Sequence, residues 1–285
     1  MNFFRLTLFI ALGLFITACG SAEESSNSAV QSATDTANIN IYAGKAEYVK
    51  INEPITLNII KVPNIEYVSS YLWTFKGNTL ATTRSFSYTP TNLGLDVLEF
   101  TVFYNDGLKV SDSINIGVTA TELNTNIPTI SESLKVAYLN AVNNARTKPQ
   151  NCGTKGSFPS TTVLTWNDKL YESAYEHMQD LIESQTFAHE GSGSESDWTG
   201  YLLGKKSDLI ERAESHEYKW SRLGENLGGG TSFIQAKEMV QGWLKSDNHC
   251  ENLMNPNFTE VGMAMIKDEN SLYIHYWGQE FGTPK

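Results

Sequence analysis

One stretch decides the fold of the C-terminal half: Trp243-Leu244-Lys245-Ser246-Asp247-Asn248-His249-Cys250. Before it, Ser232 and Gln235 have the spacing of a helix cap. The helix that follows has one apolar face, made of Ala236, Met239, Val240 and Trp243. The stretch therefore predicts a helix packed on a core, followed by polar side chains, a histidine and a cysteine.

Helices and strands are mixed around this stretch. Thr129-Ile130-Ser131-Glu132 has capping-box spacing, and the helix after it has an apolar face of Leu134, Ala137, Tyr138, Ala141, Val142 and Ala145. Asn167 is the expected cap of a second helix, whose buried side is Leu170, Ala174, His177, Met178 and Leu181. Strands are predicted at 260–266 and 272–281. Because the elements do not alternate as βαβ units, the pattern is typical of an α+β domain.

The region 38–120 has a different pattern, with short β-branched and aromatic runs separated by turn residues. Strands are predicted at 55–60, 71–75, 98–104 and 110–118. The turn Asn105-Asp106-Gly107 joins the last two strands as a hairpin. Strands at this spacing, without helical periodicity, predict a β-sandwich with Trp73 in its core.

The first residues have the features of an export signal. Arg5 precedes an apolar run from Leu6 to Ile16, which is shorter than the roughly 20 residues of a membrane-spanning helix. The run leads into Ile16-Thr17-Ala18-Cys19-Gly20, which resembles a lipobox, where the cysteine is acylated and the chain is cut before it. The alternative is an ordinary cleaved signal with an incidental Cys19. We expect a signal peptide at 1–18 and a polar, flexible tether at 19–37.

Charge and cysteine content limit the partners. The chain has 285 residues, enough for two domains, and a formal net charge of −11, which disfavours nucleic acid. The two remaining cysteines, Cys152 and Cys250, lie far apart in sequence. In an exported protein such a pair indicates one disulfide rather than a metal site.

Parts of 38–120 resemble a PKD-like repeat of the immunoglobulin-like class. The resemblance rests on Tyr71-Leu72-Trp73-Thr74-Phe75, Phe86-Ser87-Tyr88-Thr89-Pro90 and Leu98-Glu99-Phe100-Thr101-Val102. It departs at Lys76-Gly77-Asn78, where the family usually has an acidic turn. The polar segment 121–130 is the expected linker to the second domain.

The second domain, 131–285, resembles the bacterial branch of the CAP superfamily of cysteine-rich secretory, antigen 5 and pathogenesis-related proteins. Seven fragments occur in the family's order: 139–146, 164–170, 187–189, 224–227, 243–250, 252–262 and 276–282. The resemblance implies a three-layer α-β-α sandwich. The chain is thus expected to be an N-terminal β-sandwich followed by a CAP fold.

The resemblance also implies a cleft lined by His189, Glu225 and His249. Ser246 stands where the family often has a second glutamate, with Asp247 beside it, so the family's four-residue set is incomplete. Asn226 is expected at the cleft in a structural role. Glu225 has an alternative interpretation, in which it only accepts backbone N–H bonds from its glycine-rich loop.

Metal binding is a possible use of this cleft. Two neutral imidazoles, His189 and His249, suit Zn²⁺ but form an incomplete ligand set. The sequence therefore predicts no required cofactor, and Zn²⁺ held weakly if it is held.

Other candidate residues have simpler interpretations. His177 lies on the apolar face of its helix and is expected in the core, and His216, in a charged stretch, is expected to be solvated. His275 alternates with aromatic residues, so it is either buried or on the surface. Gly228-Gly229-Gly230 is interpreted as a flexible turn before a helix rather than a phosphate loop.

Three functions remain open. The first is a lipid-tethered binding protein whose cleft takes a lipid, glycan or peptide, with the β-sandwich as spacer or adhesion module. The second is an envelope hydrolase that uses His189, Glu225 and His249, although no serine lies in a nucleophile elbow. The third is a structural spacer that contacts wall polymer. Binding is favoured over enzymatic activity.

Lipidation of Cys19 is directly testable. No aspartate follows Cys19, so in a two-membrane bacterium we expect the protein at the outer membrane, facing the periplasm or the cell surface. Cys19→Ser is expected to move the protein from the membrane fraction to the soluble fraction, measured by cell fractionation. A variant that stays in the membrane, together with wild-type protein of unmodified mass, would contradict the anchor.

Overall fold

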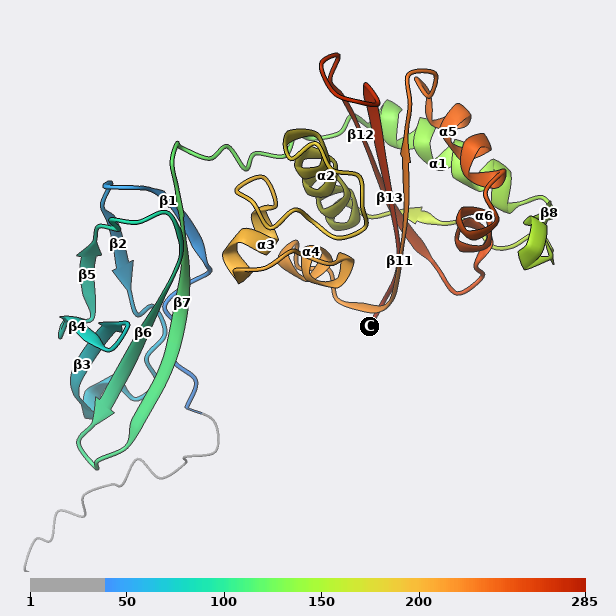
Figure 1. Cartoon of the computed structure of the whole chain (residues 1–285). Coiled ribbons are helices and arrows are strands. Elements are labelled where there is room, and N and C mark those ends of the chain that lie inside the picture. Colours follow the sequence, from blue (N-terminus) through green and yellow to red (C-terminus); the bar gives the residue numbers. More distant parts are fainter. Residues whose placement is uncertain (1–38) are drawn as a thin grey trace, which may run out of the picture.

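The computed structural model of the protein describes residues 39–285. The predicted signal peptide, Cys19 and the tether lie outside the described residues. Two domains follow each other, joined by a connection from 120 to 131 that contains no helix or strand (Figure 1). Within 39–285, no helix combines the length and the apolar character needed to cross a membrane.

The N-terminal domain is a β-sandwich with two sheets. The larger sheet has the strand order β1-β7-β6-β3-β4, and the smaller one pairs β2 with β5. The strands are β1 (Glu47–Lys50), β2 (Ile55–Asn58), β3 (Val68–Phe75), β4 (Asn78–Ala81), β5 (Ser85–Tyr88), β6 (Gly94–Tyr104) and β7 (Lys109–Thr119). A short 3₁₀ helix, η2 (Ile65–Tyr67), precedes β3.

Trp73 forms the centre of this sandwich, as predicted. Its side chain is fully buried, and its ring lies 5.1 Å from that of Phe86 and 5.0 Å from that of Phe100, between centroids. Trp73 and Phe100 belong to the larger sheet and Phe86 belongs to the smaller one. The large apolar area of Trp73 therefore packs the two sheets against each other.

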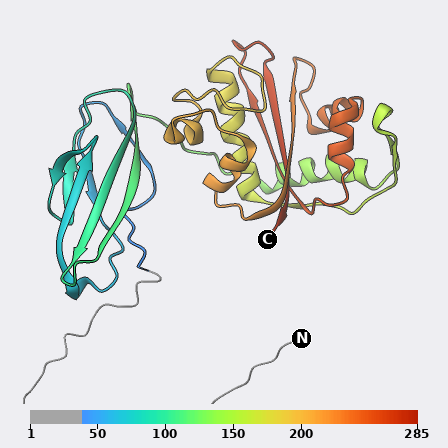
Figure 2. The same ribbon diagram turned by 60° about the horizontal axis from the view of Figure 1, so that its bottom comes forward.

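The C-terminal domain has the predicted three layers. Its helices are α1 (Glu132–Arg146), α2 (Asp168–Glu183), α3 (Trp198–Leu203), α4 (Leu209–Ser215), α5 (Ala236–Leu244) and α6 (Asp247–Met254). A four-stranded sheet of order β10-β12-β13-β11 lies between α1, α5 and α6 on one side and α2, α3 and α4 on the other (Figures 1 and 2). Its strands are β10 (Thr165–Trp166), β11 (Trp220–Gly229), β12 (Glu260–Lys267) and β13 (His275–Pro284). Two short strands, β8 (Gln150–Asn151) and β9 (Ser157–Phe158), flank the 3₁₀ turn η3 (Gly153–Lys155).

One predicted helix cap is confirmed and two are wrong. Asn167 caps α2, since its side chain accepts hydrogen bonds from the N–H groups of Lys169 and Leu170. Helix α1 is capped by Ser131 rather than Thr129, because the Ser131 hydroxyl reaches the N–H of Leu134. Helix α5 begins after Gln235 rather than after Ser232, and the Glu238 carboxylate accepts a hydrogen bond from the N–H of Gln235.

The buried face of α1 is narrower than its periodicity indicates. Leu134 and Ala137 are exposed, whereas Tyr138, Val142 and Ala145 are buried. The helix ends with a residue that periodicity did not predict in the core, Arg146, whose guanidinium is fully buried. It donates to the carbonyl oxygens of Thr162, Leu253 and Asn255. This charged side chain therefore connects α1 to the segment before β10 and to the C-terminal end of α6.

The glycine-rich stretch is a strand, not the predicted flexible turn. Gly228 and Gly229 belong to β11 and pair with Trp277 and Tyr276 of β13. A Cβ at Gly228 would lie 2.4 Å from the sulfur of Met239, so the glycine lets α5 pack directly on the strand. Several predicted boundaries also shift. Strand β13 begins at His275 rather than at 272 and ends at Pro284 rather than at 281, and β2 ends at Asn58 rather than at 60. Strands β3 and β6 begin earlier than predicted, at Val68 rather than at 71 and at Gly94 rather than at 98.

The predicted disulfide is confirmed. Cys152 and Cys250 are bonded, with a Cα–Cα distance of 5.3 Å, and both are buried. The bond connects the chain after α1 to the middle of α6, and it spans a sequence separation of 98 residues. It therefore holds α6, with His249 next to Cys250, against the rest of the domain.

Removal of this disulfide is expected to destabilise the domain. A Cys152→Ala/Cys250→Ala double variant should lose about 2–4 kcal/mol of unfolding free energy, because the unfolded chain gains the freedom of a loop of about a hundred residues. Urea unfolding measures this loss. A reducing agent is the control, since it should destabilise the wild type and leave the variant unchanged. Equal unfolding midpoints for the wild type and the variant without reducing agent would contradict the expectation.

Candidate functional site

The five residues predicted at the cleft line one groove beside the edge strand β11. This groove, called the His189 groove below, has a volume of about 500 Å³. It is lined by His189, Glu225, Asn226, Ser246, Asn248, His249, Glu251, Asn252 and Asn255. The residues come from the loop after α2, from β11 and from α6, so the tertiary fold brings together positions that are distant in the chain.

A buried ion pair forms the base of the groove. The Glu225 side chain is 3% exposed, and its two oxygens have different partners. Oε1 accepts a hydrogen bond of 2.6 Å from Nδ1 of His189, and Oε2 accepts one of 2.9 Å from Nη2 of Arg212. The same Nη2 also donates to the backbone carbonyl of His189, at 3.1 Å. Arg212 therefore positions both members of the His189–Glu225 pair.

Glu225 is ionised despite its burial. Burial alone would raise its pKa, but the charge of Arg212 and the hydrogen bond from His189 outweigh burial and lower the pKa to about 2. The alternative interpretation of Glu225 is wrong, because its partners are side chains rather than backbone N–H groups of a glycine-rich loop.

The two histidines of the groove are shifted in opposite directions. The hydrogen bond to Glu225 raises the pKa of His189, whose side chain is 62% exposed. Burial, reinforced by the neighbouring charge of His189, lowers the pKa of His249. Near neutral pH, His189 is thus the ring that tends to carry a proton, and His249 is the neutral one.

Asparagine side chains hold His249 in place. Nδ2 of the buried Asn226 donates to the carbonyl oxygen of His249, and Nδ2 of Asn252 donates to the carbonyl of Glu225 and to Oδ1 of Asn226. Helix α6 lies so close to β11 that a Cβ at Gly224 would lie 2.8 Å from Oδ1 of Asn252. The sequence Gly224-Glu225-Asn226 therefore combines a close approach, a buried charge and a cross-link to α6.

Asp247 does not replace the second glutamate that the family often has at position 246. Ser246 lines the groove, but the Asp247 carboxylate is used elsewhere, since it accepts from the N–H and hydroxyl of Thr154. Glu251, one helical turn further along α6, lines the groove instead and forms a 2.8 Å ion pair with Lys155. Sequence reasoning missed Glu251, although the i, i+4 spacing of Asp247 and Glu251 puts both on α6.

The remaining histidines are all at least partly buried. His177 lies in the core, as predicted, and its Nε2 contacts the carbonyl oxygen of Ala188 at 2.9 Å, next to His189. Burial lowers the pKa of His177 to about 4, so the ring is neutral. The expectation for His216 is wrong: it is 16% exposed and contacts the Glu176 carboxylate at 2.7 Å. His275 is buried on β13.

Two further ionisable residues of the site were not found by sequence reasoning. Arg212 lies in a charged stretch that had no distinguishing pattern. Glu280 lies directly opposite Glu225 in the β11–β13 register, and its carboxyl is fully buried. Burial and the charge of Glu225 raise the pKa of Glu280 well above its usual range, so the proton of this acidic pair belongs to Glu280. The period-2 pairing of two strands would reveal this pair only once the register is known.

The donor set does not complete a zinc site. Nδ1 of His189 is occupied by Glu225, which leaves Nε2 of His189 and the His249 ring as nitrogen donors. Within residues 39–285, no three histidine, cysteine or acidic side chains gather in a geometry that could hold a metal. Catalytic zinc sites use three protein ligands. Weak Zn²⁺ binding by the two histidines stays a prediction.

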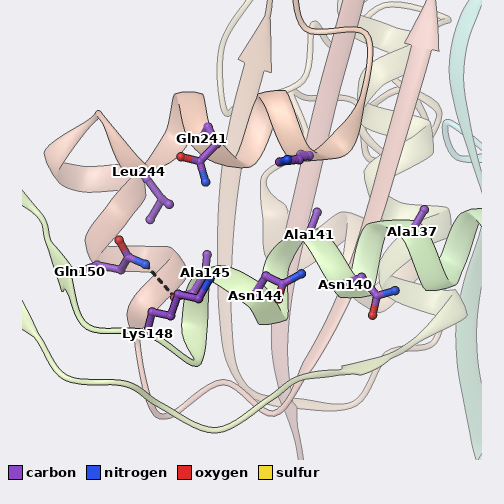
Figure 3. Close-up of a pocket in the computed structure, with 10 residues that line it drawn as sticks. Ala137, Asn140, Ala141, Asn144, Ala145, Lys148, Gln150, Gln241 and Leu244 are labelled. Atoms are coloured by element: carbon purple, nitrogen blue, oxygen red, sulfur yellow. Dashed lines mark hydrogen bonds between the residues drawn. The ribbon is translucent and has the colours of Figure 1, made fainter.

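A second groove lies between α1 and α5 and contains none of the predicted site residues. It has a volume of about 610 Å³, and Figure 3 shows its alanine-rich wall, where Gln150 donates to the carbonyl of Ala145. Its lining is Ala137, Asn140, Ala141, Asn144, Ala145, Lys148, Gln150, Lys237, Gln241 and Leu244. The lining has no carboxylate or imidazole, so of these two grooves only the His189 groove has side chains that could act as an acid or a base.

The C-terminal half is similar to known proteins. The model of the cysteine-rich secretory protein family (CAP) matches residues 139–281, half of the chain. An uncharacterized membrane protein of Bacillus subtilis strain 168, YlbC, is 26% identical over 102 residues, which are 36% of this chain and 25% of YlbC. The uncharacterized protein YkwD of the same organism is 26% identical over 118 residues, 41% of this chain and 38% of YkwD. The chain thus spans less than half the length of either relative.

Among solved structures, similarity extends over most of the chain at low identity. An extracellular protein from Bacillus anthracis that contains an SCP domain is 16% identical, with a TM-score of 0.38, over 81% of this chain and 78% of that one.

The Glu225–His189 hydrogen bond should be visible in an NMR titration. The His189 midpoint is expected above 6.5 and the His249 midpoint below it. Glu225→Gln should lower the His189 midpoint, because the ring loses its charged acceptor. It should also cost about 3–5 kcal/mol of unfolding free energy, because Arg212 stays buried without its partner.

Glu251→Gln is the matched control, since Glu251 lines the same groove without a bond to either imidazole. An unchanged His189 midpoint in Glu225→Gln would refute this geometry.

The pH dependence of the unfolding free energy has a definite sign. The stability from Glu225 is present above its unfolded pKa of 4.5 and is lost as pH falls from there through about 2. The smaller contribution of His189 is present below 6.5 and is lost as pH rises through its folded pKa.

Proposed function

Because the chain belongs to the cysteine-rich secretory protein (CAP) family, we propose that it is an exported protein whose His189 groove binds a glycan. The observation that carries this proposal is the composition of the groove. All nine lining residues have side chains that donate or accept hydrogen bonds, and none is aliphatic or a phenylalanine, tyrosine or tryptophan. Sugar hydroxyls are both donors and acceptors, so a glycan can use such a surface along its whole length.

The charge states suit a hydroxyl-rich ligand. The neutral His249 ring has one donor and one acceptor nitrogen, and the side chains of Asn248 and Asn255 add amide donors and acceptors. A volume of about 500 Å³ lies in the usual range for small-ligand sites. The buried Glu225–Arg212 pair keeps the His189 ring in one orientation before any ligand arrives, which reduces the entropic cost of binding.

A lipid or a peptide fits the groove less well. A fatty acyl chain gains its affinity by burying apolar area, for which this lining offers no apolar side chain. A peptide needs pockets for alternate side chains, and the polar wall supplies none of apolar character. The glycan is therefore the ligand class that we favour among the three.

Attachment to the cell envelope is a further part of the proposal. The sequence around Cys19 supports a lipid anchor at the outer membrane, and the polar residues after it would give the two domains reach. An extracellular location is proposed for this chain on the strength of its family and its apolar N-terminal run.

Hydrolysis is the second candidate, and one observation favours it. His189 and His249 have pKa values shifted apart, which is the arrangement of a general acid and a general base. His189 would protonate the leaving oxygen while neutral His249 takes a proton from water, and the water oxygen forms the new bond as the old one breaks.

Calorimetric titration with a tetrasaccharide of N-acetylglucosamine tests the binding proposal. A His189→Ala/His249→Ala double variant should bind about tenfold or more weakly, since it loses at least two hydrogen bonds. Asn144→Ala is the matched control, because Asn144 lines the groove between α1 and α5, and it should bind as the wild type does.

Palmitate and an alanine tetrapeptide serve as competing ligand classes. Tight palmitate binding without sugar binding, or equal sugar binding by wild type and double variant, would overturn the glycan proposal. Mass spectrometry of the recovered sugar decides the second candidate: shortened products that the double variant does not form would support hydrolysis.

A further inference from the structure

The β-sandwich contacts the CAP domain mainly at one short helix, besides an exposed Lys45–Glu217 ion pair and a hydrogen bond from the N–H of Ala120 to the Glu195 carboxylate. Nδ2 of Asn115 donates to the carbonyl oxygen of Leu202 at 2.7 Å, and the Tyr201 hydroxyl donates to the carbonyl of Val118, also at 2.7 Å. The Tyr48 hydroxyl donates to the carbonyl of Trp198. All three bonds join β1 or β7 to α3, so helix α3 is the docking point between the domains.

The absence of a side chain at Gly117 allows this docking. A Cβ at Gly117 would lie 2.8 Å from the ring of Tyr48 and 3.1 Å from Cδ2 of Leu202. The backbone of β7 is therefore in close contact with both a sandwich residue and an α3 residue. Any larger residue at 117 would force Tyr48 or Leu202 to move.

Helix α3 belongs to a segment, 190–208, that is held by three buried carboxylates. One of them, Glu176 of α2, accepts a hydrogen bond from the N–H of Thr199. Asp197 accepts hydrogen bonds from the N–H groups of Gly193, Gly200 and Ser207 and from the Ser207 hydroxyl. Asp180 of α2 accepts from the N–H and hydroxyl of Ser192 and from the hydroxyl of Ser196. These bonds make segment 190–208 one connected unit.

Apart from Trp198 of α3, which is buried, segment 190–208 buries little apolar area that could order it. Residues 191–194 are Gly-Ser-Gly-Ser, which lose much conformational entropy on folding and bury almost no apolar area. A segment of this kind depends on its hydrogen bonds and on what packs against it. The β-sandwich packs against its only helix.

Arg212 connects this segment to the His189 groove. Its Nη1 donates to the carbonyl oxygen and hydroxyl of Ser207, at 3.3 and 3.2 Å. Its Nη2 donates to the His189 carbonyl and to Oε2 of Glu225. His189 itself directly precedes the segment. A displacement of segment 190–208 therefore moves the backbone of His189 and the guanidinium that orients Glu225.

We propose that the β-sandwich is a positioning module for the His189 groove: its docking on α3 orders segment 190–208 and, through Arg212, sets the His189–Glu225 geometry. The groove then has its full geometry only in the two-domain chain. The proposal relies on the proposed function only for its effect on glycan affinity.

The experiment uses the full two-domain chain with two kinds of interface variant. Tyr48→Ala/Asn115→Ala removes two of the hydrogen bonds that the sandwich donates to α3. Gly117→Val places a side chain where Tyr48 and Leu202 now lie. Glu47→Ala/Ser113→Ala is the matched control, because it changes exposed residues on the same two strands. Hydrogen–deuterium exchange is measured for segment 190–208, and NMR for the Cε1–H signal of the His189 ring.

Both interface variants should exchange segment 190–208 about tenfold faster than the wild type, as expected for the loss of two hydrogen bonds. The His189 signal should shift, while the control variant behaves as the wild type. Unchanged exchange in β6 and β12 shows that both domains stay folded. If a variant does unfold the sandwich, the other variant decides the result.

Wild-type exchange rates in segment 190–208 of both folded variants would overturn the proposal, and so would an unmoved His189 signal. Affinity for the N-acetylglucosamine tetrasaccharide is measured in parallel and should fall in both interface variants. An unchanged affinity would contradict an effect of the β-sandwich on ligand binding in the His189 groove. If the wild type binds no sugar, the proposed function fails, but exchange and NMR still decide the positioning role.

Discussion

A buried carboxylate, Glu225, sets the constraint on which the rest of the CAP domain depends. An ionised group in the interior needs an opposite charge and hydrogen bonds, and Arg212 and His189 supply both. To deliver these partners, α4 must lie against β11, and the loop after α2 must return to the same strand. The packing of one side of the sheet is thus linked to the position of the groove's exposed histidine.

The strand register adds a second constraint. Glu225 and Glu280 face each other across β11 and β13, and two adjacent buried carboxyls cannot both be ionised at low cost. The proton belongs to Glu280 because Arg212 and His189 stabilise the charge on Glu225. The base of the groove therefore has one buried negative charge, beside one histidine that favours protonation and one that does not.

The opposite wall of the groove is held by covalent and amide links. The disulfide of Cys250 anchors α6, while Asn226 and Asn252 join the helix to β11. The wall formed by α6 is therefore held by covalent and amide links. The wall that contains His189 continues into segment 190–208, which is ordered by polar contacts and by the β-sandwich. This asymmetry explains how a neighbouring domain could influence His189 without touching the groove.

The sequence by itself determined the fold class, the two-domain order, the core role of Trp73, the cap at Asn167 and the disulfide, because periodicity, capping and cysteine count are local or additive signals. The family resemblance added His189, Glu225 and His249. Only the tertiary structure decided that Glu225 is buried, that Arg212 and Glu280 share its site, and that Glu251 rather than Asp247 reaches the groove. It also showed that Gly228 and Gly229 lie in a strand and that His216 is partly buried. These features depend on strand register and on contacts between residues far apart in the chain, and no local pattern encodes which distant charge will lie beside a buried one.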